Sequence, residues 1–236
     1  MRLQENELTH PLIADLRREL WLAADASKAP AMRAYMKSEM PFHGVQSTAL
    51  RAIQRRCFAR HPLDGFEVWR EVTLQLWREA RYREERYAAI ALTGYKAYQE
   101  YQGLRCLPMY EEMIVTGAWW DYVDAIASHR LGELLRRHPR PMKTRMLSWS
   151  RCRDLWKRRA AILCQLGFKR ETDLDLLYAC ILQSAGDPEF FLRKAIGWAL
   201  RQYAWTDPAE VRRFVQEHES ELSPLSRREA CKNVAR

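Results

Sequence analysis

Two pairs of side chains at helical spacing carry the chemistry that this sequence offers. Trp120 and Asp124 are four residues apart, so a helix through them places an indole and a carboxylate on one face. Trp198 and Arg201 are three residues apart, so a second helix can present an indole beside a guanidinium. A carboxylate stabilises developing positive charge, and an indole face attracts a cation. For a single helix, the plainer alternative is a core aromatic beside a solvated acid.

The stretch around Trp120 predicts a helix over residues 116–137, with Thr116 as its N-cap. Asp121 is the rival carboxylate in this stretch. It lies one residue from Trp120, about 100° around the helix, in the first turns where a negative charge suits the helix dipole. We therefore interpret Asp121 as a residue of the helix start and Asp124 as the candidate for chemistry.

The composition is that of a helical protein, with only 9 Gly among 236 residues and no convincing alternation typical of strands. A second helix is expected after Ser27, read as an N-cap, with Pro30 in its first turn. The pattern predicts further helices at about 8–24, 47–60, 65–80, 84–101, 109–115, 142–150, 154–167, 173–185, 188–204, 208–220 and 224–234.

An internal period organises these helices. The dipeptide Ala-Ile recurs at intervals of 37, 36, 36 and 34 residues, each time in the second helix of a predicted pair. Its copies are Ala52-Ile53, Ala89-Ile90, Ala125-Ile126, Ala161-Ile162 and Ala195-Ile196. A small Ala allows close helix approach and an Ile fills the seam between repeats. The sequence thus predicts an all-α fold: a curved solenoid of HEAT-like helical pairs, forming one domain over residues 1–236.

The same period aligns polar residues on the expected concave side. Tyr87, Arg159 and Arg193 each lie three residues before the Ile of their repeat, and Asp124 lies two before its own. The formal net charge is +9 and the pI is about 9.4, which indicates attraction to a polyanion, first nucleic acid and second an anionic membrane. A concave basic groove suits a duplex backbone. The plain alternatives are solvated or ion-paired arginines on an ordinary basic protein.

Other features narrow the class. The six cysteines form no C-x-x-C pair and no zinc-like spacing with His, so we expect reduced core thiols and no metal site. They are Cys57, Cys106, Cys152, Cys164, Cys180 and Cys231. The N-terminus lacks an apolar signal region and no apolar run is long enough to span a membrane, so a cytoplasmic, nucleoid-associated protein is expected. One basic groove per chain suggests a monomer.

Five stretches carry a resemblance to a known family. They are residues 32–37 (MRAYMK), 112–124 (EMIVTGAWWDYVD), 156–162 (WKRRAAI), 190–203 (FFLRKAIGWALRQY) and 223–230 (SPLSRREA). With them the sequence resembles the AlkD-type DNA alkylation repair glycosylases, which are HEAT-like repeat proteins. The resemblance runs from about residue 31 to 233, and residues 46–105 match less clearly.

The resemblance implies release of cationic N3- and N7-alkylated purines from double-stranded DNA, as in base excision repair, without drawing the base into a pocket. It implies Asp124 as the catalytic carboxylate and Trp120 and Trp198 as lesion-facing indoles. It also implies DNA contacts by Arg159, Arg201 and Tyr35; Arg193 joins them through the internal period.

This chemistry suits the residues. A cationic purine is already a good leaving group, so a carboxylate need only stabilise the charge that develops on the deoxyribose and orient or deprotonate water. No cofactor is required. Two other classes stay open: a catalytically silent HEAT-repeat protein that binds damaged or branched DNA, and a protein–protein scaffold, which the arginine-rich inner helices disfavour. Neither the preferred alkyl group, methyl or bulky, nor a choice between general repair and self-resistance follows from the sequence.

Overall fold

The protein is described by a computed structural model over residues 9–234, and the regular structure in this range is helical without strands. The predicted all-α class is therefore confirmed. The chain divides into two compact units, residues 1–101 and 102–236. The single domain, the curvature and the concave groove expected from the sequence stay predictions.

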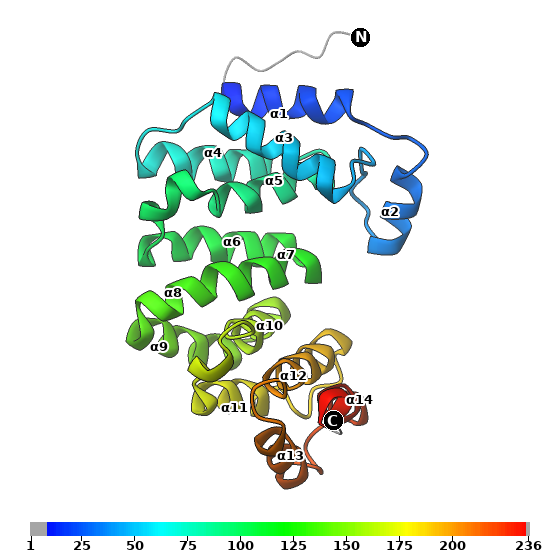
Figure 1. Ribbon diagram of the computed structural model, residues 1–236, viewed down its shortest axis with the longest axis vertical. Helices are drawn as coiled ribbons and strands as arrows, with labels where there is room; N and C mark the ends of the chain where they lie inside the picture. The colour runs from blue at the N-terminus through cyan, green and yellow to red at the C-terminus, as the bar shows by residue number, and fades with distance from the viewer. Residues whose placement is uncertain (1–8, 235–236) are drawn as a thin grey trace. The chain divides into compact units, whose positions relative to one another are not determined.

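Within residues 9–101, the first unit contains five α-helices and one 3₁₀ segment (Figure 1). They are α1 (Pro11–Leu22), α2 (Ala29–Met36), α3 (Ser47–Arg60), α4 (Phe66–Arg78), α5 (Arg83–Thr93) and η1 (Lys96–Tyr101). Helix α3 packs against both α1 and α5, and α4 packs against α5.

The described part of the second unit, residues 102–234, contains nine α-helices joined by short turns. They are α6 (Leu107–Gly117), α7 (Trp120–Ala125), α8 (Gly132–Arg137), α9 (Pro139–Ser150), α10 (Leu155–Leu163), α11 (Leu174–Leu182), α12 (Phe190–Tyr203), α13 (Pro208–Glu217) and α14 (Pro224–Ala230). Four shorter segments connect or end them: η2 (Leu104–Cys106), the π-helical η3 (Ile126–Leu131), η4 (Lys169–Glu171) and η5 (Cys231–Asn233).

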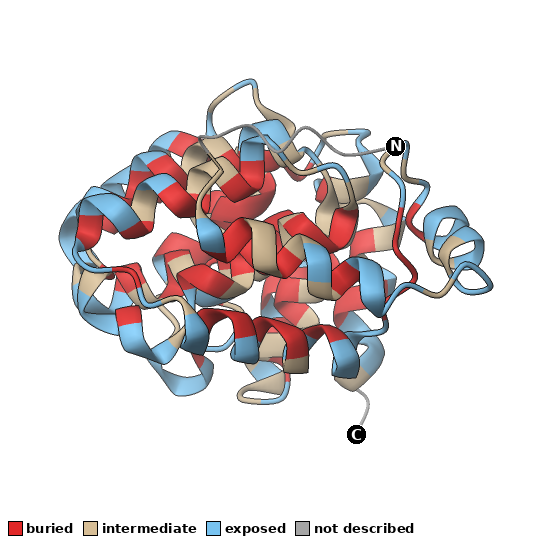
Figure 2. Cartoon of the chain, turned by 90° about the horizontal axis from the view of Figure 1, so that it is seen from above, coloured by how far each residue is buried: buried red, intermediate tan, exposed pale blue. Residues whose placement is uncertain are grey.

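The Ala-Ile period marks helices that stack on one another within each unit. Its five copies fall on α3, α5, the α7–η3 junction, α10 and α12, and the Ile of every copy is buried. In the first unit α3 contacts α5, and in the second unit α10 contacts both α7 and α12. Figure 2 shows buried residues on helix faces that meet neighbouring helices and exposed residues on the opposite faces. The Ala-Ile repeat therefore marks helices that pack against one another through buried Ile side chains.

Several predicted helix boundaries are wrong, each for a local reason. Thr116 is not an N-cap but lies in the last turn of α6, where its hydroxyl donates to the Glu112 carbonyl at 2.7 Å. Ala118 then adopts a left-handed conformation (φ 43°), which ends α6, and Trp119 is the extended residue that precedes α7. Ser27 does not cap α2 either, because its N–H and hydroxyl both donate to the Asp25 carboxylate.

Two other boundaries differ from expectation. The helix expected at 84–101 ends at Thr93, where Gly94 caps it, and the chain continues as η1. Helix α9 begins at Pro139 rather than at residue 142, because proline suits the first turn of a helix. The helix expected over 116–137 begins only at Trp120 and then runs through α7, η3 and α8 to Arg137.

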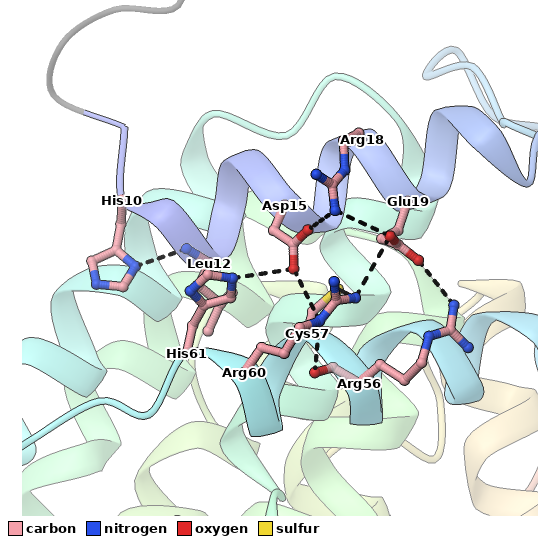
Figure 3. A network of polar contacts seen from close by, with 9 residues as sticks. All are labelled: His10, Leu12, Asp15, Arg18, Glu19, Arg56, Cys57, Arg60 and His61. Atoms are coloured by element: carbon pink, nitrogen blue, oxygen red, sulfur yellow. Dashed lines mark hydrogen bonds and ion pairs between the residues drawn. The ribbon is translucent and has the colours of Figure 1, made fainter.

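A polar network holds α1 against α3 above an apolar seam (Figure 3). The Asp15 carboxylate meets Arg18 of its own helix and the His61 ring at 3.1 Å, and Glu19 pairs with Arg56 at 3.0 Å. The apolar side of α1 is fully buried through Leu12, Ile13, Leu16 and Leu20. Burial supplies most of the stability of this contact, since surface ion pairs contribute little.

A buried acid on α5 fixes the loop that leads out of α2. The Glu84 carboxylate accepts hydrogen bonds from the backbone N–H groups of residues 43–45, at 3.0 to 3.2 Å. Gly44 has φ +86°, and a Cβ there would lie 2.1 Å from the Asp25 carbonyl oxygen, so only glycine fits. Burial raises the pKa of Glu84, against the effect of those N–H donors. The loop therefore has a defined shape, which positions α2 and its exposed Tyr35.

Candidate active site

The centre of the candidate site is an ion pair between α7 and α10. The Asp124 carboxylate accepts from Arg159 Nε at 2.7 Å through Oδ1 and from Arg159 Nη2 at 2.8 Å through Oδ2. The third donor of the guanidinium, Nη1, reaches the backbone carbonyl of Phe191 on α12. Both side chains are nearly buried, with 12% of Asp124 and 5% of Arg159 exposed. One guanidinium thus links three helices and fixes the plane of the carboxylate.

This placement differs from the role that the resemblance implies for Arg159. A phosphate ligand needs donors that face solvent, whereas those of Arg159 are directed at Asp124 and Phe191 in the buried interface. In this structure the side chain is a partner of the carboxylate.

The environment of Asp124 favours its neutral form more than water does. Burial raises the pKa of the Asp124 carboxyl, the Arg159 guanidinium opposes this shift, and the nearby Asp121 adds to it. Asp121 itself lies in the first turn of α7, as expected, and is partly exposed. The Arg159 guanidinium thus favours the ionised carboxylate where burial disfavours it, and added positive charge nearby would favour ionisation further.

The backbone is irregular directly after this carboxylate. The π-helical segment η3 follows α7 without a break, and the Ser128 hydroxyl donates to the Asp124 carbonyl at 2.6 Å. Single π turns widen the helix and recur at functional sites.

Two indoles on helices that contribute to this centre are partly exposed. Trp120 opens α7 one turn before Asp124, and Trp198 lies on α12, the helix that Arg159 also reaches. Within residues 9–234 neither indole makes a ring contact or a hydrogen bond. By contrast, Trp119 packs against Phe191 with ring centroids 5.4 Å apart. Trp119 is therefore a packing residue, while Trp120 and Trp198 keep part of their rings exposed.

The remaining predicted site residues lie in different settings. Arg201 on α12 pairs with Glu229 of α14 at 2.9 Å. Arg193, also on α12, forms no ion pair with a described residue, and its Nε is buried without a hydrogen-bond partner. Tyr35 belongs to the first unit, on α2, and is 77% exposed. The structure therefore gathers Asp124 and Arg159 closely and places Arg193, Trp198 and Arg201 on one neighbouring helix.

Sequence reasoning missed two contributors to this region. The Phe191 carbonyl holds Arg159, and no side-chain pattern signals a backbone acceptor. Glu229 pairs with Arg201. The sequence feature that could have indicated this contact between helices is Gly197, because a Cβ there would lie 2.4 Å from the Glu229 Cβ. A glycine inside an otherwise good helix indicates such a close approach.

Some expectations about single residues are wrong. Trp21 and Trp205 have no chemical partners at helical spacing in the sequence, which predicts packing residues, yet they are 70% and 64% exposed. All six thiols are free, but Cys231 is exposed and Cys152 is partly exposed, so these two are not core residues.

Among residues 9–234, no group of His, Cys, Asp and Glu is arranged to hold a metal ion. No helix in the described range is long and apolar enough to cross a membrane.

Comparisons with known proteins agree with this picture. A family model described as DNA alkylation repair enzyme matches residues 16–234. A solved structure, a predicted DNA alkylation repair enzyme from Enterococcus faecalis, is 30% identical and superposes with a TM-score of 0.82. The match covers 90% of this chain and 97% of that one. No curated protein matches the sequence. The family match spans nearly the whole chain, so this protein belongs to the DNA alkylation repair enzyme family, whose role is in DNA repair.

Proposed function

We propose that this protein is a DNA glycosylase that hydrolyses the N-glycosidic bond of cationic N3- or N7-alkylated purines in duplex DNA. The observation that carries the proposal is the Asp124 carboxylate, held in one plane by Arg159, one helical turn from the partly exposed indole of Trp120. A preorganised charge beside an open aromatic face suits a reaction that builds positive charge on a sugar.

The chemistry needs no proton donor. Alkylation leaves the purine positively charged, and breaking the bond between C1′ and the purine nitrogen returns the electron pair to the base, which departs neutral. Positive charge builds on C1′ and the ring oxygen, where the Asp124 carboxylate stabilises it. The oxygen of a water molecule then forms the new bond to C1′, and its proton passes to the carboxylate or to solvent.

The indoles give this reaction selectivity. Trp120 and Trp198 can contact the charged lesion and the sugar through cation–π attraction. Each such contact contributes about 1 to 2 kcal/mol at a partly desolvated site. A neutral purine gains less from the same faces. Because both indoles are partly exposed, we infer that the lesion is contacted from its surface, without base flipping into a pocket.

The DNA contacts complete the proposal. Arg201, Arg193 and Tyr35 are the candidates for contacts with the DNA backbone, and Arg159 contributes chiefly through Asp124.

In this proposal the protein acts as a monomer on double-stranded DNA that contains alkylated purines, in the cytoplasm at the nucleoid. One family model spans residues 16–234, across both units, which supports a single functional domain.

One observation favours a second candidate, a catalytically silent protein that binds damaged or branched DNA. Both oxygens of Asp124 are already occupied by Arg159, so the carboxylate is largely neutralised in its resting arrangement. A purely structural ion pair between α7 and α10 would have the same geometry. The two candidates differ in whether loss of the carboxylate abolishes base release.

The deciding experiment measures release of free base from a duplex that contains N7-methylguanine. Wild type is compared with Asp124→Asn and with the matched control Asp121→Asn, which removes a carboxylate from the same helix. We expect release by wild type and by Asp121→Asn, and none by Asp124→Asn above the spontaneous rate. Removing one partner of a buried ion pair costs about 3 to 5 kcal/mol, so thermal melting and binding to lesion-free duplex must show that the variant is folded. Equal release by all three proteins contradicts the catalytic role.

A further inference from the structure

A single buried acid holds three cations together where α12 meets α14. The Glu229 carboxylate of α14 lies 2.9 Å from Arg201 Nη1, 2.7 Å from Lys232 Nζ and 3.3 Å from Lys194 Nζ. Its side chain is only 7% exposed, whereas those of Arg201, Lys194 and Lys232 are 30%, 38% and 48% exposed. The negative charge is therefore inside and the positive charges face solvent.

The cluster lies on the same face of α12 as a candidate lesion-facing indole. Lys194, Trp198 and Arg201 follow one another at intervals of four and three residues, which places them along one stripe of the helix. Gly197 brings α14 against this stripe, since its missing Cβ leaves room for the Glu229 side chain. Helices α12 and α14 lie side by side in Figure 1 and contact each other closely. Two cations thus flank Trp198 along the helix, and Lys232 joins them from η5.

The charges of this cluster do not cancel. A structural ion pair needs one cation for each acid, but here three cations share one carboxylate, which leaves an excess of two positive charges. The Lys232 contact, together with Lys194, lowers the pKa of Glu229, so its carboxylate stays ionised near neutral pH. A fixed acid that separates and orients exposed cations leaves their outward donors available to a second anion.

We propose that Lys194, Arg201 and Lys232 form a phosphodiester-binding site beside Trp198 and that Glu229 is its positioning residue. This inference deepens the proposed function, because it takes DNA as the substrate. It adds Lys194 and Lys232 to the DNA interface. It also explains why an acid lies within a DNA-binding surface: Glu229 fixes the side chains that otherwise repel one another.

The test measures how the affinity for a lesion-free duplex depends on salt. Wild type is compared with Lys194→Gln and Lys232→Gln, and with Lys143→Gln as the matched control. Lys143 is in the same unit, pairs with Asp173 at 2.7 Å and is 40% exposed, so it matches the two test residues in charge, pairing and exposure. Melting temperatures confirm that the variants are folded.

Each lost phosphate contact should reduce the slope of log affinity against log salt by about 0.9. The deficit of Lys194→Gln or Lys232→Gln relative to wild type should therefore be roughly threefold larger at about 50 mM than at about 200 mM salt. Lys143→Gln should leave the slope near that of wild type. The site is refuted if both test variants have the slope and the affinity of the control.

Glu229→Gln tests the positioning role by the sign of its effect. If the acid merely cancels charge, its removal adds one positive charge to the surface and tightens DNA binding. If it positions the cations, binding weakens and the salt slope falls in spite of the added charge. Tighter binding by folded Glu229→Gln contradicts the positioning role.

The same preparations separate this inference from the proposed function. Base release from the N7-methylguanine duplex is measured beside binding. A protein that releases no base, yet shows the contrast between the test lysines and Lys143, keeps the phosphodiester site and loses the glycosylase function. A protein that releases base while the test lysines behave like Lys143 keeps the function and loses this site.

Discussion

Arg159→Lys tests the central claim about the site, because it keeps the positive charge and removes the fork of donors. Arg159 donates to both oxygens of Asp124 and to the Phe191 carbonyl at once. A lysine ammonium can still approach the carboxylate, but from one point, so at least one bond to it is lost. A hydrogen bond to a charged group contributes about 1.5 to 3 kcal/mol, and 1.36 kcal/mol corresponds to about one pKa unit. The pKa of Asp124, already raised by burial, should rise by roughly one to two further units.

The sign of the effect on activity follows directly. Base release requires the ionised carboxylate, so activity is lost as pH falls through the pKa of Asp124. In Arg159→Lys this loss should occur about one to two pH units higher than in wild type, while the alkaline plateau is less affected.

The free energy of unfolding depends on pH in the opposite direction. A carboxyl whose pKa is raised by folding contributes most to stability below its unfolded pKa, and this contribution is lost as pH rises through the folded pKa. The variant should therefore be more destabilised at neutral pH than in acid.

The assay is single-turnover release of N7-methylguanine across mildly acid to mildly alkaline pH, corrected for spontaneous loss, together with the dissociation constant for the duplex. If Arg159 acts through Asp124, the acid limb moves and the dissociation constant changes little. An unmoved acid limb with a weakened duplex affinity would refute the reasoning and restore the phosphate-binding role that the family resemblance implies.

Three further predictions concern stability and reactivity. Gly197→Ala should lower the free energy of unfolding by about 1 to 3 kcal/mol, measured by urea titration, because its Cβ would lie 2.4 Å from that of Glu229; Gly186→Ala, whose Cβ meets nothing within 4 Å, should be nearly neutral. Glu84→Gln should lower the same quantity by about 1 to 3 kcal/mol, since one acceptor oxygen for the backbone N–H groups is replaced by a donor; an unchanged urea midpoint would contradict this. Cys231 should react with a thiol reagent in the native state, whereas the buried thiols should react only after unfolding; equal rates would contradict the described burial. Burial raises the pKa of Cys57 to about 11 and that of Cys180 to about 12.

Helix positions were largely predictable because the signals are local. The apolar spacing of α1 and the Ala-Ile period each depend on residues within a few turns, and both are confirmed by the burial pattern. The errors lie where a tertiary or turn contact outweighs propensity. Ala118 in a left-handed conformation separates α6 from α7. The Asp25 carboxylate accepts hydrogen bonds from the N–H and the hydroxyl of Ser27, which was expected to cap α2.

The sequence proposes members for the candidate site, but it does not indicate their partners in the structure. The four-residue spacing of Trp120 and Asp124 is confirmed as one helical turn of α7. The pairing of Asp124 with Arg159 joins residues 35 apart in sequence, and that of Arg201 with Glu229 joins residues 28 apart. No spacing rule reaches across such separations, because the geometry depends on how whole helices pack.

The sequence by itself determined the all-helical class, the repeat and the face that carries an indole beside a carboxylate, because backbone hydrogen bonding and side-chain spacing along a helix are local properties. The tertiary structure alone decided which charges are buried, which are paired and which indoles stay open. Those outcomes depend on the packing of α7, α10, α12 and α14, where burial changes the free energy of a charge far more than any neighbour in sequence does.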